Sequence, residues 1–123
     1  MKLSILILFN EMNRKVVKFT PQLSELVKKG EKYTTFRIFD DKDLSEGDEI
    51  VLATRDGDTV TEFGEAIITK VNIKTVSTLS KDDFIGHEKI EGDILQHYKG
   101  YYGNTIDNNT EVKVIRFNTS RLY

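Results

Sequence analysis

With 123 residues, the chain is long enough for one domain with a substantial core and too short for two. Hydrophobic residues make up 38% and charged residues 31%, a composition typical of a globular protein and not of a disordered or fibrous one. The net charge of -2 argues against a protein that coats duplex DNA, and the absence of cysteine excludes disulfides, thiolate nucleophiles and zinc–thiolate sites.

The chain begins with a short apolar run, Leu3–Phe9, within residues 1–14. The run is too short to span a bilayer, and no small-residue cleavage site follows it. We therefore interpret residues 1–14 as an N-terminal extension or an extra strand, and we expect no membrane association and a cytoplasmic location.

A strand and a short helix are the first regular elements that the sequence predicts. The β-branched and aromatic run Val16–Phe19 predicts the strand. Thr20 and Pro21 then predict a helix start, because threonine caps helices and proline fits the first helical position. Apolar residues follow at helical spacing, and Gly30 comes directly after two lysines, as at many helix ends.

Alternating patterns predict strands in the middle of the chain. In the stretch TTFRIFD, Phe36 and Ile38 should enter the core, while Thr35 and Arg37 should face outward toward a cleft. A further strand is expected at Glu49–Thr54, followed by a hairpin turn with the sequence RDGD.

The alternating segment Phe63–Leu79 is unusually long for one strand. Its length predicts strong curvature, with a bulge near Gly64. Ser80 and the acidic residues after it predict a helix start, and a second helical stretch is expected from about Glu91 to Tyr98.

The last predicted strand is Glu111–Phe117, which leaves residues 119–123 as a C-terminal tail. Four to six short strands with few helices, not in regular βαβ alternation, indicate an α+β domain built on a small curved sheet or barrel.

The stretch GEKYTTFR, from Gly30 to Arg37, concentrates chemically capable side chains. A desolvated Lys32 could accept the proton of the Thr35 hydroxyl, and Arg37 could hold a carbonyl or phosphate oxygen. The alternative is that both cations are solvated at a strand end and that Thr35 is only a good strand former. With only His87 and His97 as histidines, and no HExxH pattern, we expect no metal and no other cofactor.

GEKYTTFR resembles the GxKxxxxR motif of the ASCH domain, a small fold related to the PUA domain of RNA-modifying proteins. Other stretches are similar to further family segments in the same order: KFTPQLSELVKKG, LSEGDEIVL, FGEAIITKV, DFIGHEKIEGDILQHYKGYYG and VKVIRF. The resemblance places an ASCH domain at residues 15–118. It implies a PUA-like small mixed β-barrel of about five to six strands, with two to three short helices flanking a cleft.

Within this superfamily the motif is similar to that of small bacterial enzymes that hydrolyse N(4)-acetylcytidine to cytidine and acetate. The resemblance implies that Lys32 and Thr35 are catalytic, with Thr35 attacking the acetyl carbonyl and Lys32 accepting its proton. Glu88 is the nearest match to the glutamate that protonates the departing nitrogen, and Glu91 is the alternative.

The resemblance also suggests substrate-binding residues. Arg37 would orient the base or stabilise negative charge. An apolar acetyl pocket would come from Tyr33 or from aromatic residues of the helical segment, such as Tyr98 and Tyr101. Gly30 and His87 are the other candidates.

Two other functions remain open for the same cleft. A non-catalytic RNA-binding module would use it to hold a base, and an RNA-cleaving activity would use its acid and base groups. The expected partner is a modified nucleoside or single-stranded RNA, not duplex DNA or a membrane. No sequence feature indicates a particular oligomeric state.

Overall fold

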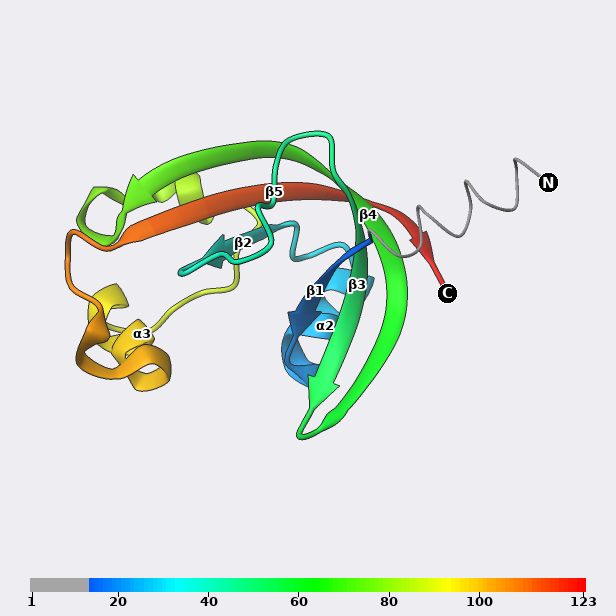
Figure 1. The fold of residues 1–123 in the computed structure, drawn as a ribbon, viewed down its shortest axis with the longest axis horizontal. Coiled ribbons are helices and arrows are strands. Elements are labelled where there is room, and N and C mark those ends of the chain that lie inside the picture. The colour runs from blue at the N-terminus through cyan, green and yellow to red at the C-terminus, as the bar shows by residue number, and fades with distance from the viewer. Residues whose placement is uncertain (1–13) are drawn as a thin grey trace.

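The computed structural model describes residues 14–123, so the predicted N-terminal extension falls almost entirely outside the described residues. Five strands and two α-helices make up the fold (Figure 1). The elements are β1 (Lys15–Phe19), α2 (Pro21–Lys28), β2 (Thr34–Arg37), β3 (Glu49–Asp56), β4 (Thr59–Thr75), α3 (Ile94–Tyr102) and β5 (Glu111–Leu122). Short 3₁₀ turns lie at Val76–Thr78, Lys81–Phe84 and Gly103–Thr105.

The strands form one mixed sheet in the order β1-β3-β4-β5-β2, in which β1 pairs parallel with β3 and all other pairs are antiparallel. Figure 1 shows β4 and β5 arching over the helices, so the sheet is a curled half-barrel. The predicted α+β fold with a small curved sheet is thus confirmed.

A β-bulge lies where β4 curves. Leu52 pairs with Gly64 and Ala53 with Glu62, so that Phe63 is the extra residue, next to the predicted bulge position. A Cβ at Gly64 would lie 2.6 Å from the carbonyl oxygen of Arg121, which explains why glycine is needed there. The strand ends at Thr75, earlier than predicted, because residues 76–78 form a 3₁₀ turn.

The α-helices begin at residues marked by local capping signals, and α3 begins later than predicted. Thr20 caps α2 by accepting the N–H of Leu23 at 3.3 Å, as predicted. The helix expected from Glu91 instead begins at Ile94, because the side chain of Asp93 accepts the N–H of Leu95 at 2.9 Å. No helix within residues 14–123 is long and apolar enough to cross a membrane.

β5 runs on through the segment that was predicted to be a C-terminal tail. Leu122 pairs with Gly64, and the N–H of Tyr123 bonds the carbonyl of Phe63 at 3.0 Å. The register of β4 and β5 shifts between Glu65 and Ala66, where Ser120 of β5 is the extra residue, and the sequence pattern does not signal the pairs beyond this shift.

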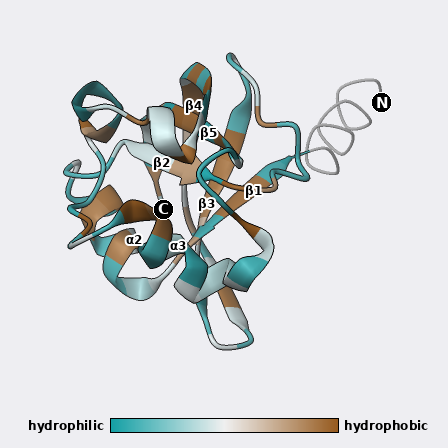
Figure 2. Cartoon of the chain, turned by 90° about the vertical axis from the view of Figure 1, so that its left-hand side faces the viewer, coloured by the Kyte–Doolittle hydropathy of each residue, from teal (hydrophilic) through white to brown (hydrophobic). Residues whose placement is uncertain are grey.

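Two apolar clusters form the core, and the strands carry the hydrophobic bands seen in Figure 2. The first lies between α2 and the β1-β3-β4 side of the sheet and includes Ile115 and Phe117 of β5. The second lies between β2 and α3 and includes Val112 and Val114. β5 therefore contributes to both clusters through residues that alternate along the strand.

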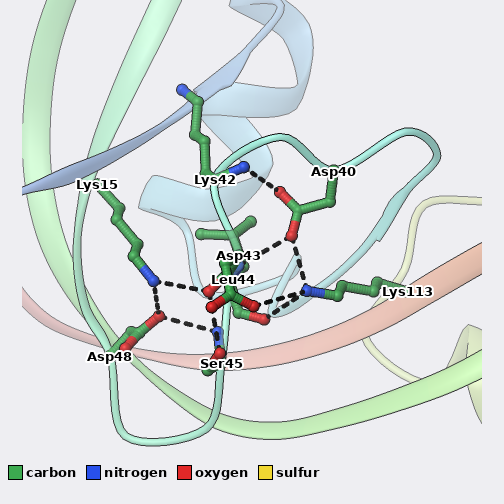
Figure 3. A network of polar contacts seen from close by, with 8 residues as sticks. All are labelled: Lys15, Asp40, Lys42, Asp43, Leu44, Ser45, Asp48 and Lys113. Atoms are coloured by element: carbon green, nitrogen blue, oxygen red, sulfur yellow. Dashed lines mark hydrogen bonds and ion pairs between the residues drawn. The ribbon is translucent and has the colours of Figure 1, made fainter.

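The β2–β3 connection spans the concave side and is held at both ends by lysines (Figure 3). Lys113 on β5 donates to Asp40 at 2.8 Å and to the carbonyl of Leu44 at 3.0 Å. Lys15 on β1 donates to Asp48 at 2.7 Å. Because these bonds link β1 to β5 through the loop, they stabilise the curvature of the sheet.

Candidate active site

The end of α2 turns Lys32 into the protein. Gly30 adopts φ +76°, and the N–H groups of Glu31 and Lys32 both bond the carbonyl of Leu26, at 2.9 and 3.1 Å. This compact helix end reverses the chain, and Lys32 is left with 2% of its surface exposed. Lys32 is therefore not a solvated charge at a strand end.

The loop that follows Phe84 docks on the start of β2. The carbonyl of Gly86 accepts the N–H groups of Tyr33 and Thr34 at 2.8 and 3.0 Å, and the Thr34 hydroxyl donates to the carbonyl of Ile85 at 2.6 Å. A Cβ at Gly86 would lie 2.4 Å from the Tyr33 ring, and Gly86 has φ +78°. Only glycine fits this close approach, which brings His87 and Glu88, the next two residues of the loop, to the start of β2.

Glu88 of the docked loop is the ion-pair partner of Lys32. The Lys32 ammonium donates to the Glu88 carboxylate and, at 2.7 Å, to the carbonyl of Thr34. This carbonyl belongs to the peptide that joins Thr34 to Thr35, so the ammonium lies against the backbone of Thr35. The side chains of Lys32 and Glu88 are 1% and 23% exposed, so the pair is buried on the lysine side and reaches solvent on the glutamate side.

The surroundings of Lys32 and Glu88 shift the pKa values of both side chains. Burial lowers the pKa of Lys32, although the negative charge of Glu88 opposes this shift. Burial by itself would raise the pKa of Glu88, but the charge and hydrogen bond of Lys32 outweigh it and hold that pKa below its usual value. The ion pair is therefore the resting form, and burial makes the neutral pair more accessible than it would be in water.

A cavity of about 180 Å³ lies beside this pair, in the space between the two apolar clusters. Its lining comes from the end of β1, from α2, β2 and α3, and from the docked loop. The lining residues are Lys18, Phe19, Thr20, Leu23, Thr35, Phe36, Arg37, His87, Glu88, His97, Tyr98, Tyr101 and Tyr102. Lys32 is not among them and meets the cavity through Glu88.

Thr35 presents a hydroxyl to this cavity that has no fixed role in the fold. Its residue is only 8% exposed, and no hydrogen bond of its side chain is found among residues 14–123. Its neighbour Thr34 is different, because the Thr34 hydroxyl is committed to the loop. The structure thus brings Thr35 and Glu88 to one cavity, with Lys32 behind them.

His87 is held as a neutral ring. It stacks on Phe36 with 4.0 Å between ring centroids and an angle of 24°. Its Nδ1 lies 2.8 Å from the backbone carbonyl of Glu88, which can only accept, so Nδ1 carries the proton. Burial and the positive charge of Lys32 lower the pKa of His87, which leaves Nε2 as a hydrogen-bond acceptor.

Arg37 extends from β2 into the cavity lining without a carboxylate partner among the described residues. One Nη donates to the carbonyl of Lys18 at 3.1 Å, and the guanidinium lies 5.8 Å from the Phe19 ring centroid. Its buried Nε has no hydrogen-bond partner. Burial lowers the pKa of Arg37, but a guanidinium stays charged, so this cation can bind a further acceptor.

Aromatic residues of α3 form the opposite wall. His97 packs edge-on to Tyr98 and Tyr101, with ring centroids 5.2 and 5.5 Å apart. Burial, together with the charge of Glu88, raises the pKa of Tyr98, so its hydroxyl stays protonated. These rings offer flat apolar faces for a planar ligand.

Two predicted substrate-binding residues lie elsewhere. Tyr33 does not line the cavity, because its ring covers Gly86 and is 42% exposed. Gly30 also lies outside the lining, since it ends α2. The choice between the two glutamates is clear in the structure: Glu91 is exposed and pairs with Lys89 at 3.5 Å, whereas Glu88 meets Lys32.

Several lining residues were not expected from the sequence. Lys18 was not considered, and Phe36 was expected only in the core, although it also lines the cavity. The aromatic run YKGYYG was a signal for the α3 wall, whereas nothing local marks Lys18. Within residues 14–123, no group of three or more His, Cys, Asp or Glu side chains is arranged to hold a metal ion.

No family model and no curated protein matches the chain by sequence. Similar solved structures exist. A protein of Enterococcus faecalis, of family DUF984, aligns with a TM-score of 0.69 and 18% identity over 98% of this chain and 92% of that one.

Two ASCH-domain structures are also similar. The ASCH protein of Zymomonas mobilis aligns with a TM-score of 0.64 and 15% identity, over 89% of this chain and 71% of that one. An ASCH domain from Lactobacillus crispatus aligns with a TM-score of 0.56 and 14% identity, over 80% and 70% of the two chains. The chain therefore has the ASCH-domain fold, a PUA-like α+β architecture.

Proposed function

We propose that the protein is a metal-independent amidohydrolase that removes the acyl group from an N(4)-acylated cytidine, of the N(4)-acetylcytidine type. The observation that supports it is the buried Lys32–Glu88 pair, which lies against the backbone of a cavity-lining Thr35. This arrangement combines a nucleophile, a base and an acid at one point.

The neutral form of the pair is the reactive one, in which Glu88 has taken a proton from Lys32. Thr35 Oγ attacks the acetyl carbonyl, and its proton passes to the Lys32 amine. Glu88 then gives its proton to N4 of the base as the C–N bond breaks, so that cytidine leaves and the acetyl group stays on Thr35. Water attacks this ester, Glu88 takes one proton of the water and Lys32 returns one to Thr35, which releases acetic acid and restores the neutral pair; the acid then loses its proton to solvent as acetate.

The other lining residues suit a cytosine ring. The tyrosines of α3 can stack on it, and Nε2 of His87 can accept a hydrogen bond. Arg37 can donate to the carbonyl oxygen of the base or to the developing oxyanion.

The size of the cavity limits what it can enclose. Pockets for drug-sized ligands typically span about 300–1,000 Å³, more than the 180 Å³ found here. The acylated base therefore occupies the cavity, and the sugar stays at its mouth. The absence of cysteine agrees with a cytoplasmic enzyme.

The experiment uses two adjacent threonines as a matched pair. Purified protein is incubated with N(4)-acetylcytidine, and cytidine and acetate are separated by chromatography. Thr35→Val should reduce cytidine release to background while leaving the melting temperature near that of the wild type, because the Thr35 hydroxyl makes no hydrogen bond within residues 14–123.

Thr34→Val should lower the stability of the protein and keep its cytidine release. It leaves the half-exposed Ile85 without the hydroxyl donor to its carbonyl, which costs about 1 kcal/mol, yet it retains turnover by the folded fraction. Turnover by Thr35→Val at the wild-type rate would refute the nucleophile, and no cytidine release by folded wild type would refute the substrate class.

A non-catalytic RNA-binding module is the second candidate, and the unpaired Arg37 favours it. On this proposal, binding of short single-stranded RNA weakens with rising salt, is lost in Arg37→Ala and is kept in Thr35→Val. Equal RNA affinity in wild type and Arg37→Ala would count against it.

A further inference from the structure

Lys18, Arg37 and Lys42 lie where the cavity of the candidate active site, called the reaction cavity below, adjoins two other hollows of the surface. Lys18 lines both the reaction cavity and a broader groove of about 510 Å³. Lys42 lines that groove and a small pocket of about 80 Å³. Arg37 lines this small pocket and the reaction cavity, so the three residues surround one junction.

The three cations come from different parts of the fold. Lys18 is on β1, Arg37 is on β2, and Lys42 is in the connection to β3. Backbone bonds hold two of them in place: Arg37 donates to the carbonyl of Lys18 at 3.1 Å, and Lys42 donates to the carbonyl of Val16 at 2.5 Å. The junction is thus built by tertiary contacts.

No carboxylate within residues 14–123 forms an ion pair with Lys18, Arg37 or Lys42. Asp40 and Asp41 also line the small pocket, and Asp40 is held by Lys113 at 2.8 Å. The buried Nε of Arg37 remains without a partner. Burial and the positive charges of Lys18 and Arg37 lower the pKa of Lys42, and the charges of Asp41 and Asp40 offset only part of this shift.

Such a cluster is unexpected in a protein with a net charge of -2, because like charges at close range repel. An anion with several acceptor oxygens would relieve the repulsion and satisfy the open donors. A phosphate group fits this description, and the planar fork of arginine binds phosphate well. The cluster borders the cavity that the acylated base occupies in the proposed function, because Lys18 and Arg37 both line it.

We propose that Lys18 and Lys42, together with those Arg37 donors that do not serve the base or the oxyanion, form a phosphate subsite, so that the preferred substrate is a phosphate ester of the acylated nucleoside and not the free nucleoside. This inference rests on the proposed function for the identity of the base. The phosphate belongs either to a mononucleotide or to a single-stranded RNA, since both present the same group to the cluster.

A binding experiment tests the subsite without requiring turnover. The full chain is titrated calorimetrically with cytidine, with cytidine 5′- and 3′-monophosphate, and with a short oligocytidylate. The wild type should bind at least one phosphorylated ligand about tenfold or more tightly than cytidine, as expected for charge-assisted hydrogen bonds. This preference should weaken as the salt concentration rises.

The double variant Lys18→Gln/Lys42→Gln should lose most of the preference for phosphorylated ligands. Lys70→Gln is the charge-matched control, because Lys70 is exposed on β4 and lines neither the cavity nor the groove, and it should keep the preference. A mononucleotide that binds as tightly as the oligonucleotide indicates a nucleotide substrate, and tighter binding of the oligonucleotide indicates RNA.

Equal affinity of the wild type for cytidine and for every phosphorylated ligand would overturn the subsite, as would an undiminished preference in the double variant. The outcome is separable from that of the hydrolysis assay. If phosphate-dependent binding is present but acetylated cytidine, its monophosphates and an N(4)-acetylated oligocytidylate are all left unhydrolysed, the subsite stands and the amidohydrolase is refuted.

Discussion

Removing the charge from either member of the Lys32–Glu88 pair should have unequal effects on stability. The two substitutions are Glu88→Gln, which keeps a hydrogen-bond acceptor, and Lys32→Met, which keeps the length of the aliphatic chain. The Lys32 side chain is 1% exposed and that of Glu88 is 23% exposed. Glu88→Gln therefore leaves a buried ammonium without a counter-charge, whereas Lys32→Met leaves a carboxylate that water can reach.

The magnitudes follow from these exposures. Breaking a fully buried ion pair by removing one partner costs about 3–5 kcal/mol, and the partial exposure of Glu88 reduces our expectation for Glu88→Gln to about 2–3 kcal/mol. Lys32→Met should cost less, about 1–2 kcal/mol: the methionine fills the space of the lysine chain and the carboxylate becomes hydrated, but the buried carbonyl of Thr34 loses its donor.

The dependence on pH gives a second readout. Without the charge of Glu88, the pKa of Lys32 in the folded protein falls further below its ordinary value of 10.5. When the folded pKa of a lysine lies below the unfolded one, stability increases as the pH rises between the two values. The stability deficit of Glu88→Gln should therefore narrow from about pH 7 to about pH 10.

Urea unfolding followed by far-UV circular dichroism measures both effects, with Lys89→Met as the control because Lys89 pairs with Glu91 on the surface. A Lys32→Met variant that loses as much stability as Glu88→Gln, or a deficit of Glu88→Gln that does not change with pH, would refute the reasoning about which partner is buried.

Two further predictions concern the elements that hold the site. Gly86→Ala should lower stability by about 1–2 kcal/mol through its left-handed backbone, and it should also reduce turnover because the new Cβ meets Tyr33 and displaces the loop; an unchanged melting temperature would contradict this. Asp40→Asn should cost about 1–3 kcal/mol in chemical unfolding at neutral pH, because the charge-assisted bond from Lys113 is lost. Although burial opposes it, the bond from Lys113 lowers the pKa of Asp40, so this stabilisation is present above the ordinary value of 3.8 and is lost as the pH falls below it. A wild type whose stability advantage over Asp40→Asn persists at about pH 2 would contradict that assignment.

Local patterns in the sequence were sufficient for most of the secondary structure. The cap at Thr20 depends on neighbouring residues alone and was predicted as found. The strand around Phe36 was predicted as well, but β2 ends at Arg37, and Thr34, Thr35 and Phe36 are all buried, because α3 and the docked loop cover the side that alternation placed outward. The length of β4 and its bulge were also predictable, because a long alternating segment with an internal glycine can only curve. The end of β5 was not, since its last residues pair with the bulged region of a distant strand.

The candidate site was predictable only where its residues are close in the chain. Lys32, Thr35 and Arg37 lie within one short stretch, so the sequence indicated them together. The choice of Glu88 over Glu91 depends on how the loop docks through Gly86, and two carboxylates three residues apart are equivalent to a sequence pattern.

What the sequence determined by itself was the set of elements and the identity of the motif, because helix caps and strand alternation act over a few residues. The tertiary structure decided that Lys32 is buried against Glu88, that Tyr33 covers a glycine instead of a ligand, and that Lys18 and Lys42 join Arg37 at one junction. These facts depend on contacts between segments far apart in the chain, and burial and unpaired charge exist only once those contacts have formed.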